Sequence, residues 1–198
     1  KRKERAEPYL QDLYREIELQ STLFDHDREV RQLHWGGGTP GFLSRLQTQQ
    51  LMEQISDHFS LGGKGDSDYS IELDPRVVEA GDIAHLRQLG FNRISLGVQD
   101  LDEKVQIAVN RVQSLEATRT VIDDARLHGF RSINLDLIYG LPHQTPETFA
   151  KTVDITMAYK PERIALYSFA YLPWMKKHDN KIEDAHLPTN EQKLDIFL

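Results

Sequence analysis

Three consecutive glycines, Gly36 to Gly38, directly follow a short apolar segment that ends at Trp35, and Thr39 comes next. A glycine run costs conformational entropy on folding, so it is tolerated where the backbone turns tightly or approaches a ligand. After a strand, its N–H and C=O groups can point at a small molecule bound at the strand's carboxyl end. The spacing fits neither a P-loop nor the dinucleotide fingerprint, and a turn that only reverses the chain is the alternative.

Two carboxylates, Glu72 and Asp136, lie within otherwise apolar runs. An unpaired carboxylate in such surroundings would cost several kcal/mol, so each of them needs a partner. That partner is either a cation of the protein or the hydrogen-bond donors of a ligand. Both residues are therefore candidates for a binding site, with an internal Arg or Lys partner as the alternative.

Gln99 and Arg111 are two further candidates. The Arg111 guanidinium can bind a carboxylate through two hydrogen bonds, or it can be a solvated surface arginine. The Gln99 amide can position a ligand or only cap a loop. The eight histidines, His34 among them, show no metal spacing. We interpret them as core-edge or surface residues and predict no metal ligand and no catalytic side chain here.

Strand and helix patterns alternate five times along the chain, which is typical of repeated βαβ units and a parallel sheet. Strands are predicted at about 30–35, 69–73, 93–98, 132–138 and 163–169, and helices at about 5–24, from Thr48, 82–89, 114–128, from Pro146 and after Thr189. Right-handed crossovers place all strand carboxyl ends on one side, so the candidate residues should meet on one rim. A partial or full (β/α) TIM-like barrel fits this α/β pattern, and so does an open doubly wound sheet.

Composition limits the possible functions. The 198 residues carry a net charge of −7, which argues against nucleic acid and anionic membranes as partners. The absence of cysteine excludes a disulfide scaffold and any thiolate-ligated metal within these residues. The glycine-rich stretch 60–68 is expected to be a flexible surface connection. Both ends of the sequence are expected to be cut, so that residues 1–198 form one domain of a longer protein.

Several motifs together resemble the radical S-adenosylmethionine (SAM) enzymes, and within them the oxygen-independent coproporphyrinogen III oxidases. The resemblance covers nearly the whole chain. The segments that carry it are LHWGGGTP at 33–40, IELDPR at 71–76, SLGVQD at 95–100, VNRVQ at 109–113, NLDLIYGLPHQT at 134–145 and AYLP at 170–173.

The resemblance implies a barrel-like α/β domain with SAM and a [4Fe–4S] cluster as cofactors. In this family, three cysteines after the first barrel strand hold the cluster, and SAM occupies its open iron. Reductive cleavage of SAM gives a radical that abstracts hydrogen from a propionate side chain. Two propionates of the tetrapyrrole are thereby converted to vinyl groups with loss of carbon dioxide, and the protein positions the cofactor and excludes water.

The resemblance also implies roles for individual residues. Gly37, Gly38 and Thr39 should hold the amino group of SAM, partly through backbone carbonyls. Glu72 should contact polar groups of SAM.

The remaining implied roles fall later in the chain. Gln99, Arg111 and Asp136 should bind SAM or a second SAM beside it, and the backbone of Ala170 should lie against the adenine. The cysteine loop, the first strand and the C-terminal region of the family are expected to lie outside residues 1–198, so this piece alone should be inactive.

Two other functions stay open at this point. One is a heme-binding or heme-delivery protein of the same superfamily, and the other is an α/β enzyme that binds a different small molecule at the same rim. For the full-length protein we expect a monomer in the cytoplasm, with a tetrapyrrole substrate, an unidentified electron donor, and neither nucleic acid nor membrane as partner.

Overall fold

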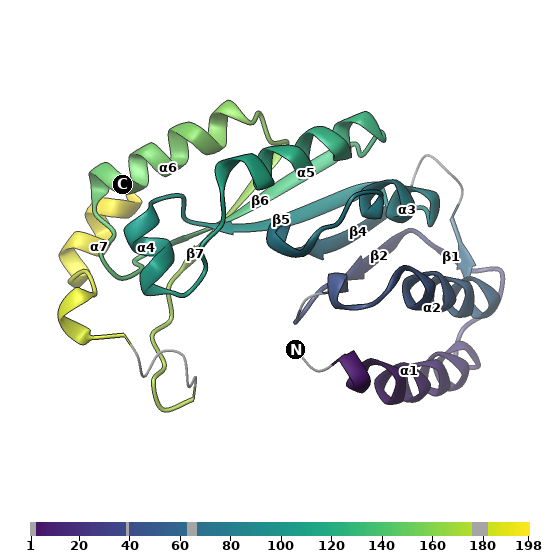
Figure 1. Ribbon diagram of the computed structural model, residues 1–198. Helices are drawn as coiled ribbons and strands as arrows, with labels where there is room; N and C mark the ends of the chain where they lie inside the picture. Colours follow the sequence, from purple (N-terminus) through teal and green to yellow (C-terminus); the bar gives the residue numbers. More distant parts are fainter. Residues whose placement is uncertain (1–2, 39, 63–66, 176–181) are drawn as a thin grey trace. The chain divides into compact units, whose positions relative to one another are not determined.

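The structure is a computed structural model that describes residues 3–38, 40–62, 67–175 and 182–198 (Figure 1). The chain divides into two compact units. The first consists of residues 1–94 and 124–131, and the second of residues 95–123 and 132–198.

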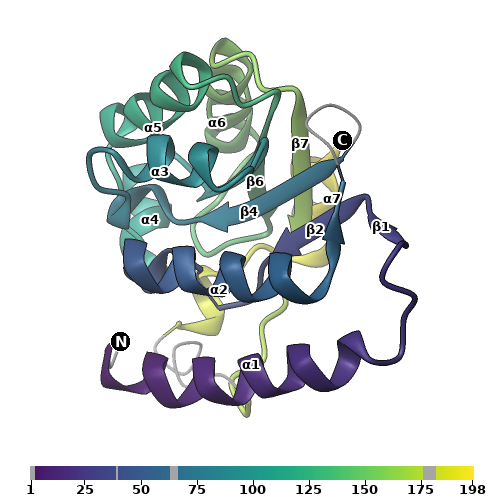
Figure 2. The ribbon, with the colours of Figure 1, turned by 90° about the vertical axis from the view of Figure 1, so that its right-hand side faces the viewer.

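The first unit contains two pairs of parallel strands and three α-helices. Its elements are α1 (Ala6–Ser21), β1 (Glu29–Val30), β2 (Gln32–Trp35), α2 (Arg45–His58), β3 (Ser60–Leu61), β4 (Asp68–Leu73) and α3 (Asp82–Gln88). Strand β1 pairs with β3, and β2 pairs with β4 in the register Gln32 to Asp68 through Trp35 to Ile71. Helix α1 lies beside α2 in both ribbon views (Figure 2).

Three local predictions for this unit need correction. The strand expected over 30–35 is divided into β1 and β2 at Arg31, and residues 60 and 61 form β3 instead of part of a loop. Residues 63–66 of that expected connection lie outside the described residues. Helix α2 begins earlier than predicted, because Ser44 is its N-cap and forms a capping box with Gln47 in the first turn. Thr48 is a buried residue in the first turn, and its hydroxyl donates to the Arg45 carbonyl.

Alternation along β4 separates the core of the first unit from a polar face. Tyr69, Ile71 and Leu73 are buried, whereas Ser70 and Glu72 are half-buried on the opposite side. Trp35 belongs to the core, where its ring packs edge-on against Phe91 at a centroid distance of 5.0 Å.

The second unit repeats the strand–helix alternation. Strand β5 (Arg93–Gln99) and helix α5 (Leu115–Leu127) each have one end in the first unit, and the other elements are α4 (Glu103–Ala108), β6 (Ser132–Tyr139), α6 (Pro146–Ala158), β7 (Arg163–Ser168) and α7 (Asn190–Phe197). Strands β5, β6 and β7 are neighbours in that order, and β6 and β7 are parallel.

Helix starts in the second unit confirm the sequence signals. Thr145 caps α6 with Pro146 at its first position, and Thr189 and Gln192 form a capping box at the start of α7. The Asp102 side chain caps α4. Across the described residues, no helix is both long enough and apolar enough to cross a membrane.

Truncation of Phe91 tests the core of the first unit. Phe91 is 0% exposed, so Phe91→Ala should lower the free energy of unfolding by about 3–5 kcal/mol through lost burial and a cavity. Urea unfolding measures this change. The control is Leu127→Ala at a side chain that is 79% exposed, for which the change should stay within about 0.5 kcal/mol. Equal effects of the two substitutions would contradict the packing described here.

Candidate functional site

The first unit carries a polar cluster at the carboxyl ends of β2 and β4, which we call the glycine-turn cluster: His34, Gly36, Gly37, Ser70 and Glu72. His34 pairs in register with Ser70, and its Nδ1 lies 2.7 Å from the Ser70 Oγ. His34 Nε2 lies 3.2 Å from the Glu72 Oε1. The backbone N–H of Gly37 donates to the Glu72 Oε2 at 3.2 Å. The structure thus joins the glycine run to the first of the two candidate carboxylates.

Two glycines of this turn are constrained in different ways. A Cβ at Gly36 would lie 2.5 Å from the His34 Nε2 and 2.9 Å from the Glu72 Oε1. Gly37 has a φ of +99°, a left-handed conformation that other residues rarely adopt. Gly38 meets neither restriction, since no atom lies within 4 Å of a Cβ built there.

The sequence suggested that Glu72 lies in an apolar environment, but the structure shows that it does not. Its side chain is 41% exposed, because it projects from the face of β4 opposite to the buried Ile71 and Leu73. His34, which was interpreted as an ordinary edge residue, is one of its partners. The sequence did contain a signal for this role of His34. His34 comes two residues before Gly36, so alternation along the strand places both residues on the same face.

The second unit carries the β5–β6 cluster: Ser95, Gly97, Gln99, Arg111, Asn134 and Asp136. The Ser95 hydroxyl donates to both carboxylate oxygens of Asp136 at 3.1 Å, and the Asn134 amide donates to the Asp136 Oδ1 at 2.6 Å. Asp136 is half-buried rather than fully buried. Hydroxyl and amide donors therefore hold the second candidate carboxylate.

Gln99 and Arg111 meet at Gly97. The Arg111 Nη2 donates to the Gly97 carbonyl at 2.9 Å, so Arg111 is not the solvated surface arginine that was the alternative. A Cβ at Gly97 would lie 2.9 Å from the Arg111 Nη2 and also 2.9 Å from the Gln99 Nε2. Gln99 itself has a φ of +70°, which is unusual for a residue other than glycine and is typical of functional sites.

Asp100 holds this strained strand end in place, and the sequence did not single it out. It is 1% exposed and accepts hydrogen bonds from the Asp102 N–H, the Thr152 hydroxyl and the Gln144 amide. The Gln144 Oε1 in turn accepts from the Gly140 N–H at 2.5 Å, which links the ends of β5 and β6. Burial raises the pKa of the Asp100 carboxyl, and the three hydrogen bonds act against that rise.

Two predicted residues remain, Ala170 and Thr39. Ala170 is exposed and lies two residues beyond the end of β7. The backbone of the preceding residue, Phe169, is held on both sides: its N–H donates to the Tyr139 carbonyl, and its carbonyl accepts from the Lys193 ammonium group. Thr39 lies outside the described residues. The described ranges contain no group of three or more His, Cys, Asp or Glu side chains that could hold a metal ion.

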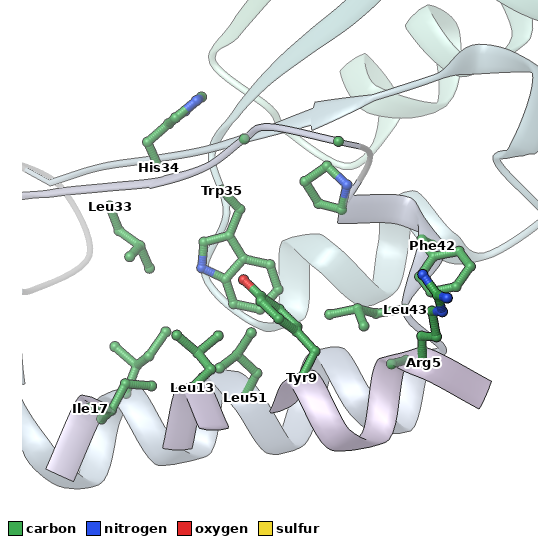
Figure 3. Close-up of a pocket in the computed structure, with 15 residues that line it drawn as sticks. Arg5, Tyr9, Leu13, Ile17, Leu33, His34, Trp35, Phe42, Leu43 and Leu51 are labelled. Atoms are coloured by element: carbon green, nitrogen blue, oxygen red, sulfur yellow. The ribbon is translucent and has the colours of Figure 1, made fainter. Parts of the chain in front are cut away.

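A cavity of about 980 Å³ in the first unit is lined by α1, α2 and β2, and also by His34 and Gly36 of the glycine-turn cluster (Figure 3). Figure 3 shows Leu33 and Trp35 pointing toward α1, where Leu13 and Ile17 complete an apolar lining, whereas His34 points to the other side of β2. Apolar side chains form most of the cavity wall, so the polar face of β2, which carries His34, is the better candidate for chemistry.

Comparison with known proteins gives one family. The model of the radical SAM superfamily matches residues 4–155. Oxygen-independent coproporphyrinogen III oxidase from Pseudomonas aeruginosa is 49% identical over 98% of this chain and 42% of its own length. The enzyme of the same name from Escherichia coli K12 is 45% identical over the same shares of both chains.

A solved structure confirms the predicted α/β fold. Coproporphyrinogen III oxidase from Escherichia coli, described as a radical SAM enzyme, matches 100% of this chain and 45% of its own with a TM-score of 0.94 at 44% identity. The chain thus has the fold of part of a TIM-like (β/α) barrel, and the open doubly wound alternative is wrong. It spans less than half the length of these relatives.

Alanine substitutions at Gly37 and Gly38 test whether the left-handed backbone conformation makes glycine necessary in the turn. Gly37→Ala should lower the free energy of unfolding by about 1–2 kcal/mol, because alanine resists the left-handed conformation. Gly38→Ala should change it by less than about 0.5 kcal/mol, since a Cβ there meets no neighbour. Thermal or urea unfolding compares the two variants. A larger loss for Gly38→Ala would contradict the turn geometry.

The raised pKa of the Asp100 carboxyl leads us to predict how the free energy of unfolding depends on pH. Its folded-state pKa is raised, so the folded protein binds the proton more tightly than the unfolded chain does. The stability of the wild type relative to Asp100→Asn is therefore highest at acid pH and falls as pH rises through the folded-state pKa.

Unfolding free energies of both proteins, measured by urea denaturation from acid to neutral pH, check this sign. Asp154→Asn, at an exposed position of α6, is the matched control for the chemical change from Asp to Asn. A difference for Asp100→Asn that grows with pH would show that the fold favours the carboxylate instead.

Proposed function

Because this chain belongs to the radical SAM superfamily, we propose that it is the SAM-binding core of an oxygen-independent coproporphyrinogen III oxidase. The proposed reaction is the oxidative decarboxylation of two propionate side chains of coproporphyrinogen III to vinyl groups, giving protoporphyrinogen IX. Support comes from relatives of that name at 49% and 45% identity, each aligned with 98% of the chain. Because those relatives are more than twice as long, the activity is proposed for the longer protein.

Membership of this family implies SAM and a [4Fe–4S] cluster as cofactors. When both are bound, they supply the radical that removes hydrogen from the substrate. The 198 residues contain no cysteine, so the thiolate ligands of the cluster must come from outside this sequence. What these residues contribute is the binding and orientation of SAM.

The two clusters offer groups that match the polar parts of SAM. Carbonyl oxygens of the turn at Gly37 and Gly38, together with Glu72, can accept hydrogen bonds from its ammonium group. The Arg111 guanidinium suits its carboxylate, to which it can donate two parallel hydrogen bonds.

The other assigned residues complete the proposed site. Asp136 and Gln99 can bind ribose hydroxyls or polar groups of a second SAM, and the backbone of Ala170 can lie against adenine. Thr39 is proposed to act beside the glycines. One observation carries these assignments: Gly37 and Glu72 meet at the carboxyl ends of the parallel strands β2 and β4, where ligands bind in α/β folds. In the second unit, hydrogen bonds join the motif residues along β5 and β6.

Further features are proposed for the full-length protein. We propose that residues 1–198 are one radical SAM core domain and are inactive without the cluster-binding segment. The protein is proposed to act as a cytoplasmic monomer on a tetrapyrrole, with an unidentified electron donor. The net charge of −7 supports the absence of nucleic-acid and anionic-membrane partners. The relatives compared above are named as oxidases, and they do not favour heme delivery.

An anaerobic assay of the full-length, iron-loaded protein tests the proposal. Coproporphyrinogen III and SAM should give protoporphyrinogen IX, measured by chromatography after oxidation to the porphyrin. Asp136→Ala should raise the Kd of SAM by about tenfold or more, because a charged hydrogen-bond acceptor is lost. Asp154→Ala, at an exposed position of α6, is the matched control and should bind SAM normally.

Two results would overturn parts of this proposal. Tight heme binding without any product would favour the heme-delivery alternative. Unchanged SAM affinity in Asp136→Ala would remove that residue from the site.

A further inference from the structure

We propose that His34 is a positioning residue that fixes the Glu72 carboxylate for the ammonium group of SAM, and that Ser70 sets the tautomer in which His34 does so. This inference rests on the proposed function. It adds two residues that neither the sequence motifs nor the family resemblance assigned.

The contacts of Glu72 show that its carboxylate is held on both oxygens. His34 Nε2 lies 3.2 Å from Oε1, and the Gly37 N–H donates to Oε2 at 3.2 Å. A carboxylate has about four acceptor positions in all, so each oxygen keeps acceptor capacity for a ligand. The two contacts fix the direction of the carboxylate without occupying it fully.

The tautomer of His34 follows from its neighbours. An ionised carboxylate only accepts hydrogen bonds, so His34 must carry a proton on Nε2 to bind Glu72. In the neutral ring, Nδ1 is then an acceptor, and the Ser70 hydroxyl at 2.7 Å can donate to it. The Ser70 hydroxyl has one proton, and the Leu33 carbonyl at 3.4 Å is its other acceptor. The contact with Nδ1 is the shorter of the two, so donation to the ring, which leaves the N–H on Nε2 for Glu72, is the arrangement that we propose.

Gly36 provides a second observation that points the same way. A Cβ at this position would lie 2.5 Å from the His34 Nε2 and 2.9 Å from the Glu72 Oε1. The contact between these two side chains thus occupies the space that any larger residue at position 36 would need. The first glycine of the run accommodates the pair of side chains, whereas the second allows the left-handed turn.

Exposure of the pair argues for positioning rather than for stability. The His34 side chain is 56% exposed and that of Glu72 is 41% exposed. Contacts this exposed contribute little to folding, because water competes for both groups. A flexible glutamate loses side-chain entropy when it binds a ligand, and a carboxylate that is already held has less to lose.

Three variants of His34 in the full-length protein test the proposal through the Kd of SAM, measured by isothermal titration calorimetry. His34→Ala should weaken binding by about tenfold, because Glu72 loses its donor. His34→Gln should restore most of the affinity, since its terminal amide can place an N–H near the position of Nε2. His34→Asn is shorter and should not restore it.

A matched control and a stability measurement separate positioning from folding. Gln32→Ala changes an exposed residue on the same face of β2, two positions from His34, and should bind SAM as the wild type does. Thermal unfolding midpoints of all four variants should stay close to that of the wild type. In activity assays, His34→Ala should raise the KM for SAM more than it lowers kcat.

A double-mutant cycle with Glu72→Ala identifies the route of the effect. If His34 acts through Glu72, adding His34→Ala to Glu72→Ala should not weaken SAM binding further. Additive losses, or normal binding by His34→Ala while Glu72→Ala binds weakly, would overturn the positioning role and leave the proposed function intact. A wild type that does not bind SAM would overturn both.

Discussion

The parallel register of β2 and β4 is the constraint on which the polar face of the first unit depends. Side chains alternate along each strand, so a register that buries Trp35 against Phe91 and Ile71 in the core also places His34 beside Ser70. A shift of one residue would exchange the two faces and expose the core residues to water. The burial that stabilises the strands therefore also aligns the groups around the glycine turn.

The second unit fixes its strand ends with a buried hydrogen-bond network. Gln99 adopts a left-handed backbone conformation that costs of the order of 1 kcal/mol or more. The adjacent Asp100 is anchored by Gln144 and Thr152, which fix where the chain leaves β5. Moving the buried Asp100 carboxyl would break several hydrogen bonds at once. The network around Asp100 can therefore hold Gln99 in its strained conformation beside Gly97.

Local signals in the sequence predicted the fold better than they predicted the partners within the site. Caps such as Thr145 and Thr189 act over three residues, so they can be identified without knowledge of the tertiary structure. Glu72 was placed in an apolar environment because neighbours in sequence were taken as its surroundings, although they point to the opposite face of the strand. His34 was missed because its partners come from a strand more than thirty residues away, and only the pairing of the strands reveals them.

Each unit holds one of the two candidate carboxylates with hydrogen-bond donors of its own. Glu72 is bound by an imidazole and a peptide N–H, and Asp136 by a hydroxyl and a side-chain amide. A lysine or arginine in these places would compensate the negative charge and compete with an incoming cation. Donors of this kind orient a carboxylate while its charge stays available. Glu72, oriented by the His34 and Gly37 donors, keeps acceptor positions on both oxygens, so a cationic group that approaches this carboxylate finds it already directed.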